Sequence, residues 1–266
     1  MVFLGSKCSG DIGIFGVPFD GTTCFRPGTR FGPDGIRFFS ENLETYSPVL
    51  DRDLENVDYV DLGNVEIPVD VQGMIAKVED FVKSVGKTVL LGGEHSVSYP
   101  VIASLKKRYG SLTVVHFDAH ADLRDDYSGS SFSHACVMRR VLDIGCDIIQ
   151  LGIRSGTREE FNLIKREEKV ELISSCLLPD ALASRDYLYV SVDIDYFDPA
   201  FAPGTGTPEP CGGNPVEFFN ILYNLPPVNV VGFDVVEVSP PYDSSGITQM
   251  LAAKIVREMI LKFWGG

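Results

Sequence analysis

The sequence predicts an α/β fold in which a parallel β-sheet lies between layers of helices. Two patterns predict this fold: short runs of apolar and β-branched residues recur along the chain, and segments of helical periodicity separate them. The runs are continuously apolar rather than alternating, as expected of strands that are covered on both faces. A strand followed by a helix, repeated about eight times, is typical of a parallel sheet flanked by helices.

The predicted strands are eight apolar runs, at residues 11–17, 57–63, 88–93, 112–118, 147–153, 169–174, 187–195 and 229–238. Helical patterns occupy residues 71–85, 98–110, 134–145, 157–168, 214–225 and 246–264. Two stretches rich in Gly and Pro, 25–35 and 198–213, are predicted to be long loops, which in α/β folds often border the functional site. The strand count also fits an eight-stranded α/β barrel, so the pattern alone leaves both architectures open.

Composition favours one soluble domain. The chain has 266 residues, of which 44% are hydrophobic and 23% charged, and it contains no repeat or Ser/Gly linker, so we expect a single domain over residues 1–266. No window approaches the run of about 20 apolar residues that spans a bilayer, and the first residues lack a basic leader. These features predict a cytoplasmic protein without a membrane partner. The six cysteines form no CxxC pair, which argues against a zinc knuckle.

The net charge indicates the kind of ligand. A formal charge of −14 opposes binding to nucleic acid and to anionic membranes, and it raises the local concentration of a cationic ligand. The sequence contains no phosphate-binding loop, no dinucleotide-binding GxGxxG between strand and helix and no GxSxG nucleophile elbow. Nucleotide chemistry therefore loses support.

The segment VVHFDAHADLRDD, residues 114–126, places ionisable side chains directly after an apolar strand. Asp118, His120 and Asp122 are two residues apart, so they lie on one side of an extended chain at the point where the strand ends. A buried strand avoids unpaired charge. Carboxylate, imidazole and carboxylate together form a set of metal ligands. His116 has the same parity but lies one step deeper, where we expect it to pack behind the site.

Two further strand ends carry similar groups. Asp193 and Asp195 are two residues apart at the end of the strand that finishes with SVDID, and His95 follows a strand and a Gly-Gly turn. Open α/β sheets bind ligands at this edge. Six ligand-type side chains on three strand ends predict two metal ions, and the cysteine-free, carboxylate-rich set favours Mn(II) over Fe(II), Co(II) or Zn(II). Four carboxylates cancel two divalent ions, which suits a cationic substrate better than a phosphate ester.

These motifs resemble those of the ureohydrolases, the arginase/agmatinase family. The similarity extends nearly from end to end through GVPFDGTTCFRPGTRFGPDGIR, LLGGEHSVSYP, VVHFDAHADLRD, FSHACVMRRVL, QLGIRS, SVDIDYFDPAFAPGTGTPEP and GFDVVEVSPPYD. Within the family the chain is most similar to agmatinases of the archaeal type. The resemblance implies the three-layer arginase fold with an eight-stranded, mainly parallel sheet, and so it favours the open sheet over the barrel.

The resemblance also implies a binuclear manganese site and a reaction. His95, Asp118, Asp122 and Asp193 would hold one ion. The other would be held by Asp118, His120, Asp193 and Asp195, with Asp118 and Asp193 bridging the two. The implied reaction is the hydrolysis of agmatine to putrescine and urea, and metal-activated water would supply the strong nucleophile that a resonance-stabilised guanidinium needs. Family members are commonly trimers or hexamers, so we expect a homo-oligomer.

Three further residues match functional positions of the family. Glu237 matches the carboxylate that binds the guanidinium, and His134 matches the catalytic histidine, which would relay protons or orient the substrate. Thr207 aligns with a threonine that contacts the substrate. Glu94, beside the metal-binding histidine, replaces the aspartate that is frequent there, and a supporting role behind the ligands is compatible with the change.

The identity of the guanidine stays open at this point. Arginases use an Asn two residues past the third ligand, where this chain has Arg124, and their acidic run is replaced here by IRSGTREE, so arginine is a weak candidate. Asp125 and Asp126 near the mouth of the site would favour a dication such as agmatine or N1-aminopropylagmatine. Arg124 would favour a carboxylate-bearing substrate such as guanidinobutyrate. A two-metal phosphoesterase or a non-catalytic metal-binding relative are the alternatives outside the family's chemistry.

Overall fold

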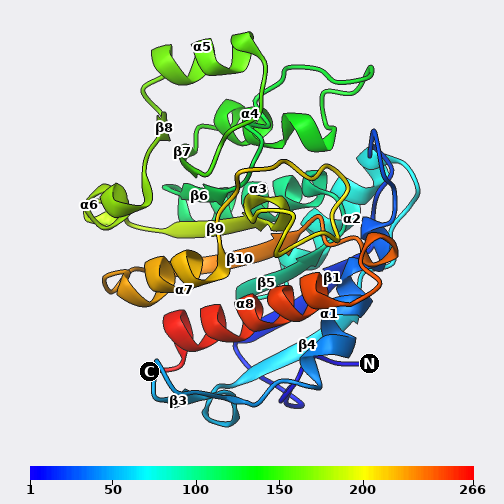
Figure 1. Ribbon diagram of the computed structural model, residues 1–266, viewed down its shortest axis with the longest axis vertical. Helices are drawn as coiled ribbons and strands as arrows, with labels where there is room; N and C mark the ends of the chain where they lie inside the picture. The colour runs from blue at the N-terminus through cyan, green and yellow to red at the C-terminus, as the bar shows by residue number, and fades with distance from the viewer.

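An eight-stranded sheet forms the centre of the molecule. The structure, a computed structural model, describes residues 1–266. All neighbouring strands of the sheet are parallel, in the order β4-β1-β5-β10-β9-β6-β7-β8 (Figure 1). Its strands are β1 (Ile12–Val17), β4 (Tyr59–Asn64), β5 (Lys87–Gly92), β6 (Thr113–Phe117), β7 (Asp147–Leu151), β8 (Val170–Leu172), β9 (Leu188–Asp193) and β10 (Val230–Val236); the short strands β2 (Tyr46–Ser47) and β3 (Arg52–Asp53) form a separate antiparallel pair.

The sheet is open. Strands β4 and β8 lie at opposite edges and do not pair with each other, so the barrel left open by the strand count is excluded. The α/β class, the eight strands and the parallel arrangement predicted from the sequence are confirmed. The strands β5, β6, β9 and β10 are buried along almost their whole length, which explains their continuously apolar sequences.

Helices cover both faces of the sheet, as Figure 1 shows. One core cluster joins the sheet to α1, α6, α7 and α8, and the other joins it to α2, α3, α4 and α5. No helix combines the length and the apolar character needed to cross a membrane. The helices are α1 (Gly32–Ser40), α2 (Val71–Val82), α3 (Ser98–Tyr109), α4 (Val137–Asp143), α5 (Arg158–Arg166), α6 (Leu178–Leu182), α7 (Pro215–Asn224) and α8 (Ile247–Trp264).

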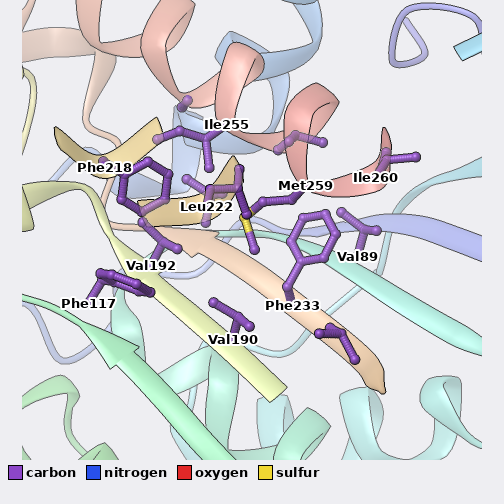
Figure 2. Close-up of a cluster of buried hydrophobic side chains, with 14 of the residues drawn as sticks. Val89, Phe117, Val190, Val192, Phe218, Leu222, Phe233, Ile255, Met259 and Ile260 are labelled. Atoms are coloured by element: carbon purple, nitrogen blue, oxygen red, sulfur yellow. The ribbon is translucent and has the colours of Figure 1, made fainter. Parts of the chain in front are cut away.

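The first core cluster shows how α7 and α8 are fixed on the sheet. Phe218 and Leu222 of α7 and Met259 of α8 lie over the strand residues Val190 and Phe233 (Figure 2). Each of these side chains is at least 95% buried, and burying one such apolar side chain stabilises the fold by about 1.5 to 3 kcal/mol. These contacts attach α7 and α8 to the central strands β9 and β10.

Helix α1 was not expected from the sequence, because it begins inside the Gly/Pro-rich stretch 25–35. Pro33 occupies the first turn of the helix, where its missing N–H forms no intrahelical bond and its fixed φ suits the helix. Gly35 lies against Pro240: a Cβ at this glycine would be 3.0 Å from the Pro240 ring. The glycine thus allows α1 to pack closely against Pro240 and does not indicate a loop. The second stretch, 198–213, contains no helix or strand, as predicted.

A buried ion pair fastens α1 to the edge strand β4. The Arg37 guanidinium donates from Nε to Oδ2 of Asp61 at 2.8 Å and from Nη2 to Oδ1 at 2.9 Å, and both side chains are fully buried. This fork-to-carboxylate geometry aligns two parallel hydrogen bonds. The carboxylate also accepts a hydrogen bond from the backbone N–H of Phe3.

We predict that Arg37→Met destabilises the protein by about 3 to 5 kcal/mol, because it leaves the Asp61 carboxylate buried without its cation. Equilibrium unfolding in urea, followed by circular dichroism, measures this change. Lys83→Met is the matched control, since Lys83 pairs with Asp80 on the surface and both side chains are largely exposed. Equal unfolding midpoints for the two variants would contradict the prediction.

Candidate metal centre and active site

The candidate site lies where the four central strands end. Strands β5, β10, β9 and β6 are neighbours in the sheet. Because parallel strands end at the same edge, the residues that follow them converge there. His95 begins a 3-10 turn shortly after β5, Asp118 follows β6, Asp193 ends β9 and Glu237 follows β10. The three strand ends that the sequence analysis singled out are thus adjacent in space.

The first group of ligand atoms surrounds the His95 ring. Its Nδ1 lies 3.1 Å from Oδ2 of Asp118, 3.2 Å from Oδ2 of Asp122 and 3.3 Å from Oδ2 of Asp193. All four residues are buried, and Nδ1 makes no hydrogen bond. A buried ring nitrogen without a hydrogen-bond partner, facing three carboxylate oxygens, fits a divalent cation that accepts oxygen and imidazole ligands.

A second group lies beside it. Nδ1 of His120 is 3.0 Å from Oδ2 of Asp195 and 3.6 Å from Oδ1 of Asp118. Asp118 therefore directs one carboxylate oxygen toward His95 and the other toward His120. This is the geometry of a carboxylate shared between two neighbouring cation sites. The residues present thus fit the pair of metal ions that the family resemblance implies.

The electrostatics of the cluster point to missing positive charge. Burial, followed by the charges of Asp195 and Asp118, raises the pKa of Asp193 well above its usual range. Burial lowers the pKa of His120, but the charge of Asp195 and the hydrogen bond with Asp118 outweigh it and raise the pKa to about 12. In both cases the protein environment favours the more positive form of the side chain. Divalent cations would supply that charge without protons.

Behind the cluster, buried polar groups orient the His95 ring. Its Nε2 lies 2.9 Å from the Ser191 hydroxyl, which donates to Oδ1 of Asp234 at 2.8 Å, and Tyr189 donates to the other oxygen of Asp234. This chain leaves Nδ1 directed toward the carboxylates. Hydrogen bonds of this kind fix the orientation and tautomer of metal-binding histidines.

His116 supports the shared carboxylate. Its Nε2 is 2.7 Å from Oδ2 of Asp118, and its Nδ1 is 3.1 Å from the side-chain nitrogen of Gln150. The residue is completely buried and both ring nitrogens have protein partners. It therefore packs behind the ligands, as the sequence analysis expected.

A cavity of about 280 Å³ opens above the cluster. Its lining includes His120 and Asp193 from the cluster together with His134, Thr207, Glu237 and Arg124. The residues predicted to bind substrate or act in catalysis are thus brought together with the predicted ligands. Thr207 donates a hydrogen bond to Oδ2 of Asp195 at 3.3 Å, so it also contacts the cluster.

Glu237 is the first residue after β10 and adopts a left-handed backbone conformation, with φ of 61°. One of its oxygens, Oε1, accepts the backbone N–H of His95 at 2.8 Å. Burial, and then the charge of Glu94, raises the pKa of Glu237 well above its usual range. Asp122 also has a positive φ, 52°. Non-glycine residues in this region are uncommon and concentrate at functional sites.

Two acidic residues proposed to attract the substrate do not line the cavity. Asp125 is largely exposed and pairs with Arg140 at 2.6 Å, and Asp126 accepts a hydrogen bond from the backbone N–H of Gly129. Arg124 does line the cavity: its Nε is 3.8 Å from Glu160, and its guanidinium lies 4.9 Å from the centre of the Tyr127 ring. Of these three charged residues, only Arg124 therefore lines the cavity, and its guanidinium is paired with the Glu160 carboxylate.

Some residues of the site were not predicted from the sequence. Asp234, Thr22, Cys24 and Tyr127 were not singled out, although Cys24 and Tyr127 line the cavity and Thr22 contacts His134. Asp234 could have been identified as Asp118 was, because it is a carboxylate within an apolar strand sequence, VVGFDVV, where an unpaired charge is unfavourable. Thr22 and Cys24 lie on an irregular loop, where no periodic pattern marks side chains that face a site.

Comparison with known proteins shows the family to which the chain is similar. A model of the arginase family matches residues 10–262. The agmatinase of Bacillus subtilis (strain 168) is 41% identical over 280 residues, covering 98% of this chain and 96% of that protein. The solved structure of agmatine ureohydrolase of Thermoplasma volcanium is 36% identical, with a TM-score of 0.86 over 98% of this chain and 93% of that one. Proclavaminate amidino hydrolase from Streptomyces clavuligerus is 31% identical, with a TM-score of 0.89 over 98% and 96%.

We predict that Mn(II) binding releases protons and that its apparent affinity falls as the pH falls. Without metal, His120 is protonated at neutral pH because its pKa is raised to about 12, whereas a coordinating imidazole must be neutral. Each displaced proton changes the apparent affinity by up to about tenfold per pH unit.

Titration calorimetry of the chelator-stripped protein with Mn(II), in two buffers of different ionisation enthalpy, counts the protons released. His120→Asn lacks the titrating ring and should release at least one proton fewer. An affinity that does not depend on pH between 6 and 8 would contradict the expectation.

Proposed function

The chain belongs to the arginase family, and from this premise we propose that it hydrolyses the guanidino C–N bond of agmatine to give putrescine and urea. The observation that carries the proposal is the cluster of His95, His120 and four aspartates at a cavity that is also lined by Glu237 and His134. Arginase-family hydrolases act on guanidino groups, and relatives named agmatinase match almost the whole chain.

We propose two Mn(II) ions as the resident cofactor. One would be held by His95, Asp118, Asp122 and Asp193, and the other by Asp118, His120, Asp193 and Asp195. When bound, the ions supply Lewis acidity that makes water nucleophilic at neutral pH. The oxygen- and imidazole-rich, thiolate-free donor set supports manganese.

Glu237 is proposed to bind the guanidinium. Its Oε1 is held by the backbone N–H of His95, which fixes the carboxylate at the edge of the cavity. Burial, and then the charge of Glu94, raises the pKa of this carboxylate, and a bound guanidinium would stabilise its charged form through two parallel hydrogen bonds. The substrate carbon would thereby be placed over the aspartate cluster.

His134 is proposed to supply the proton that the departing amine requires. Its ring lines the cavity, with Nε2 beside Sγ of Cys24 at 3.6 Å. When the C–N bond breaks, the amine nitrogen retains the electron pair and accepts a proton from Nε2. An imidazole ring can both accept and donate a proton, so it is suited to this transfer.

The proposal also specifies which group, an amine or a carboxylate, the substrate carries at the end opposite its guanidino group. The net charge of −14 favours a cationic substrate, which supports agmatine or the longer N1-aminopropylagmatine. Arg124 in the cavity wall favours a second candidate, a guanidino acid such as guanidinobutyrate, because its guanidinium suits a carboxylate. Pairing of Arg124 with Glu160 offsets that preference, so we place agmatine first and arginine last.

We further propose that residues 1–266 form one domain and that the protein is a cytoplasmic homo-oligomer, a trimer or a hexamer. Phe25, Phe31 and Phe38 are large apolar side chains that are more than half exposed, which supports an interface between copies.

Urea release by the Mn(II)-loaded protein is expected with agmatine and to disappear after treatment with EDTA. The panel should also contain N1-aminopropylagmatine, guanidinobutyrate and arginine at equal concentrations, compared by kcat/KM. Preference for guanidinobutyrate would replace agmatine with the second candidate. Absence of urea from all four compounds would reject the proposed hydrolysis.

Replacing His134 separates catalysis from metal binding. In His134→Ala we expect kcat to fall by about 10² to 10⁴-fold, because the proton donor is lost, while the manganese content per chain stays at the wild-type level. Elemental analysis of the same preparation gives the metal content. His120→Ala is the comparison, for which both activity and manganese should decrease. Wild-type kcat in His134→Ala would remove this residue from the mechanism.

A further inference from the structure

We propose that Glu94 positions His134 through the hydroxyl group of Thr22 and determines which ring nitrogen of His134 carries the proton. The inference rests on the proposed hydrolysis, since it assigns positioning residues to the histidine of that reaction. It arises from a chain of hydrogen bonds that joins the loop after β1, the turn after β5 and the start of the 3-10 turn before α4.

Glu94 is a completely buried hydrogen-bond acceptor. Its Oε2 accepts from the backbone N–H of Thr22 at 2.8 Å and from the Thr23 hydroxyl at 3.1 Å. Its Oε1 accepts from the hydroxyls of Thr22 and Ser96, each at 2.5 Å. Four donors converge on one carboxyl group, so both of its oxygens act as acceptors. The direction of the Thr22 hydroxyl is thereby fixed.

The Thr22 hydroxyl has a single proton and gives it to Glu94. Its oxygen is then an acceptor toward every other neighbour. Two atoms of His134 approach that oxygen: the backbone nitrogen, which donates at 3.1 Å, and the ring Nδ1 at 3.4 Å. For Nδ1 to interact favourably with an acceptor it must carry the proton. The arrangement therefore selects the Nδ1–H tautomer of the neutral ring.

The consequence lies at the opposite ring nitrogen. In the Nδ1–H tautomer, Nε2 has a free lone pair, and it is Nε2 that lies 3.6 Å from Sγ of Cys24 in the cavity lining. His134 is thus prepared to accept at Nε2 a proton that the attacking water gives up and to pass that proton to the departing amine. Tyr127 packs edge-on against the ring, with centroids 5.6 Å apart, and limits its rotation.

The experiment uses variants that alter the hydrogen-bond direction without removing bulk. Thr22→Val replaces the hydroxyl with a methyl group, and Thr22→Ser retains it. Thr23→Val is the matched control, because the Thr23 hydroxyl also donates to Glu94 but makes no hydrogen bond with His134. For Thr22→Val we expect kcat to decrease by about 10 to 100-fold with KM and manganese content near wild type, and we expect Thr22→Ser and Thr23→Val to retain kcat within about threefold.

Glu94→Gln tests the direction of the bond independently. Two donors, one of them the backbone N–H of Thr22, face the Oε2 position, so the amide oxygen of Gln should occupy it and the NH₂ group should face the Thr22 hydroxyl. That hydroxyl would then be free to donate to Nδ1 of His134, which favours the wrong tautomer. The expected result is the same loss of kcat as in Thr22→Val, at wild-type manganese content.

Alkylation of Cys24 by iodoacetamide provides a readout that does not depend on hydrolysis. With a lone pair on Nε2, the ring accepts the thiol proton while sulfur attacks the CH₂ carbon and iodide leaves. We expect about three- to tenfold slower alkylation in Thr22→Val and Glu94→Gln, with recovery in Thr22→Ser. Mass spectrometry of the Cys24 peptide distinguishes it from Cys8, Cys176 and Cys211, which are also exposed.

The outcomes are separable. If the wild-type protein releases no urea, the proposed function fails, but the alkylation rates still test the tautomer. If wild-type turnover is present and Thr22→Val retains it, or if Thr22→Ser and Thr22→Val lose activity equally, the positioning role is wrong. Faster alkylation of Cys24 in Thr22→Val with unchanged kcat would also overturn it, because this result would mean that Glu94 only anchors the loop.

Discussion

The burial of many carboxylates at one point is the constraint on which the rest of the structure depends. Asp118, Asp193, Asp195 and Glu237 are each less than 6% exposed at the ends of neighbouring strands. Buried anions of this density are strongly unfavourable unless cations compensate them. Here His95 and His120 direct ring nitrogens toward the carboxylates. Divalent ions, which the cluster fits, would compensate the remaining negative charge. The apolar cores on the two faces of the sheet provide the stability that the cluster itself does not.

A parallel sheet meets this constraint with little special geometry. Its strands are aligned by the ladder and end at one edge, so side chains that are far apart in sequence are brought to a common point by hydrogen bonds made elsewhere. Local backbone strain is needed at only a few places. Asp122 and Glu237 adopt positive φ angles, which directs their carboxylates into the site. Two separate groups of buried hydrogen bonds, one around Glu94 and one through Ser191 and Asp234, hold the neighbouring loop and the His95 ring.

The sequence was most informative where chemistry conflicted with burial. Charged residues after apolar runs indicated the strand ends that converge, and the continuous runs indicated a sheet covered on both faces. Periodicity failed for α1, because Pro33 and Gly35 are helix breakers in general but are tolerated at these positions by the first-turn geometry and by close packing. Periodicity also did not predict the contact of Thr22 with Glu94 or the pairing of Asp125 with Arg140. Both depend on loop conformations that no regular pattern encodes.

The position of β10 has a consequence for how the protein comes into existence. This strand is the last in the chain, yet it lies in the middle of the sheet and pairs with β5 on one side and β9 on the other. His95 follows β5, whereas Asp118 and Asp193 belong to the half of the sheet beyond β10. During synthesis the two halves of the cluster therefore have no fixed separation until residues 230–236 leave the ribosome and insert. Such non-local pairing is slow. The complete cluster, with His95 beside Asp118 and Asp193, is consequently assembled only when β10 joins the two halves of the sheet.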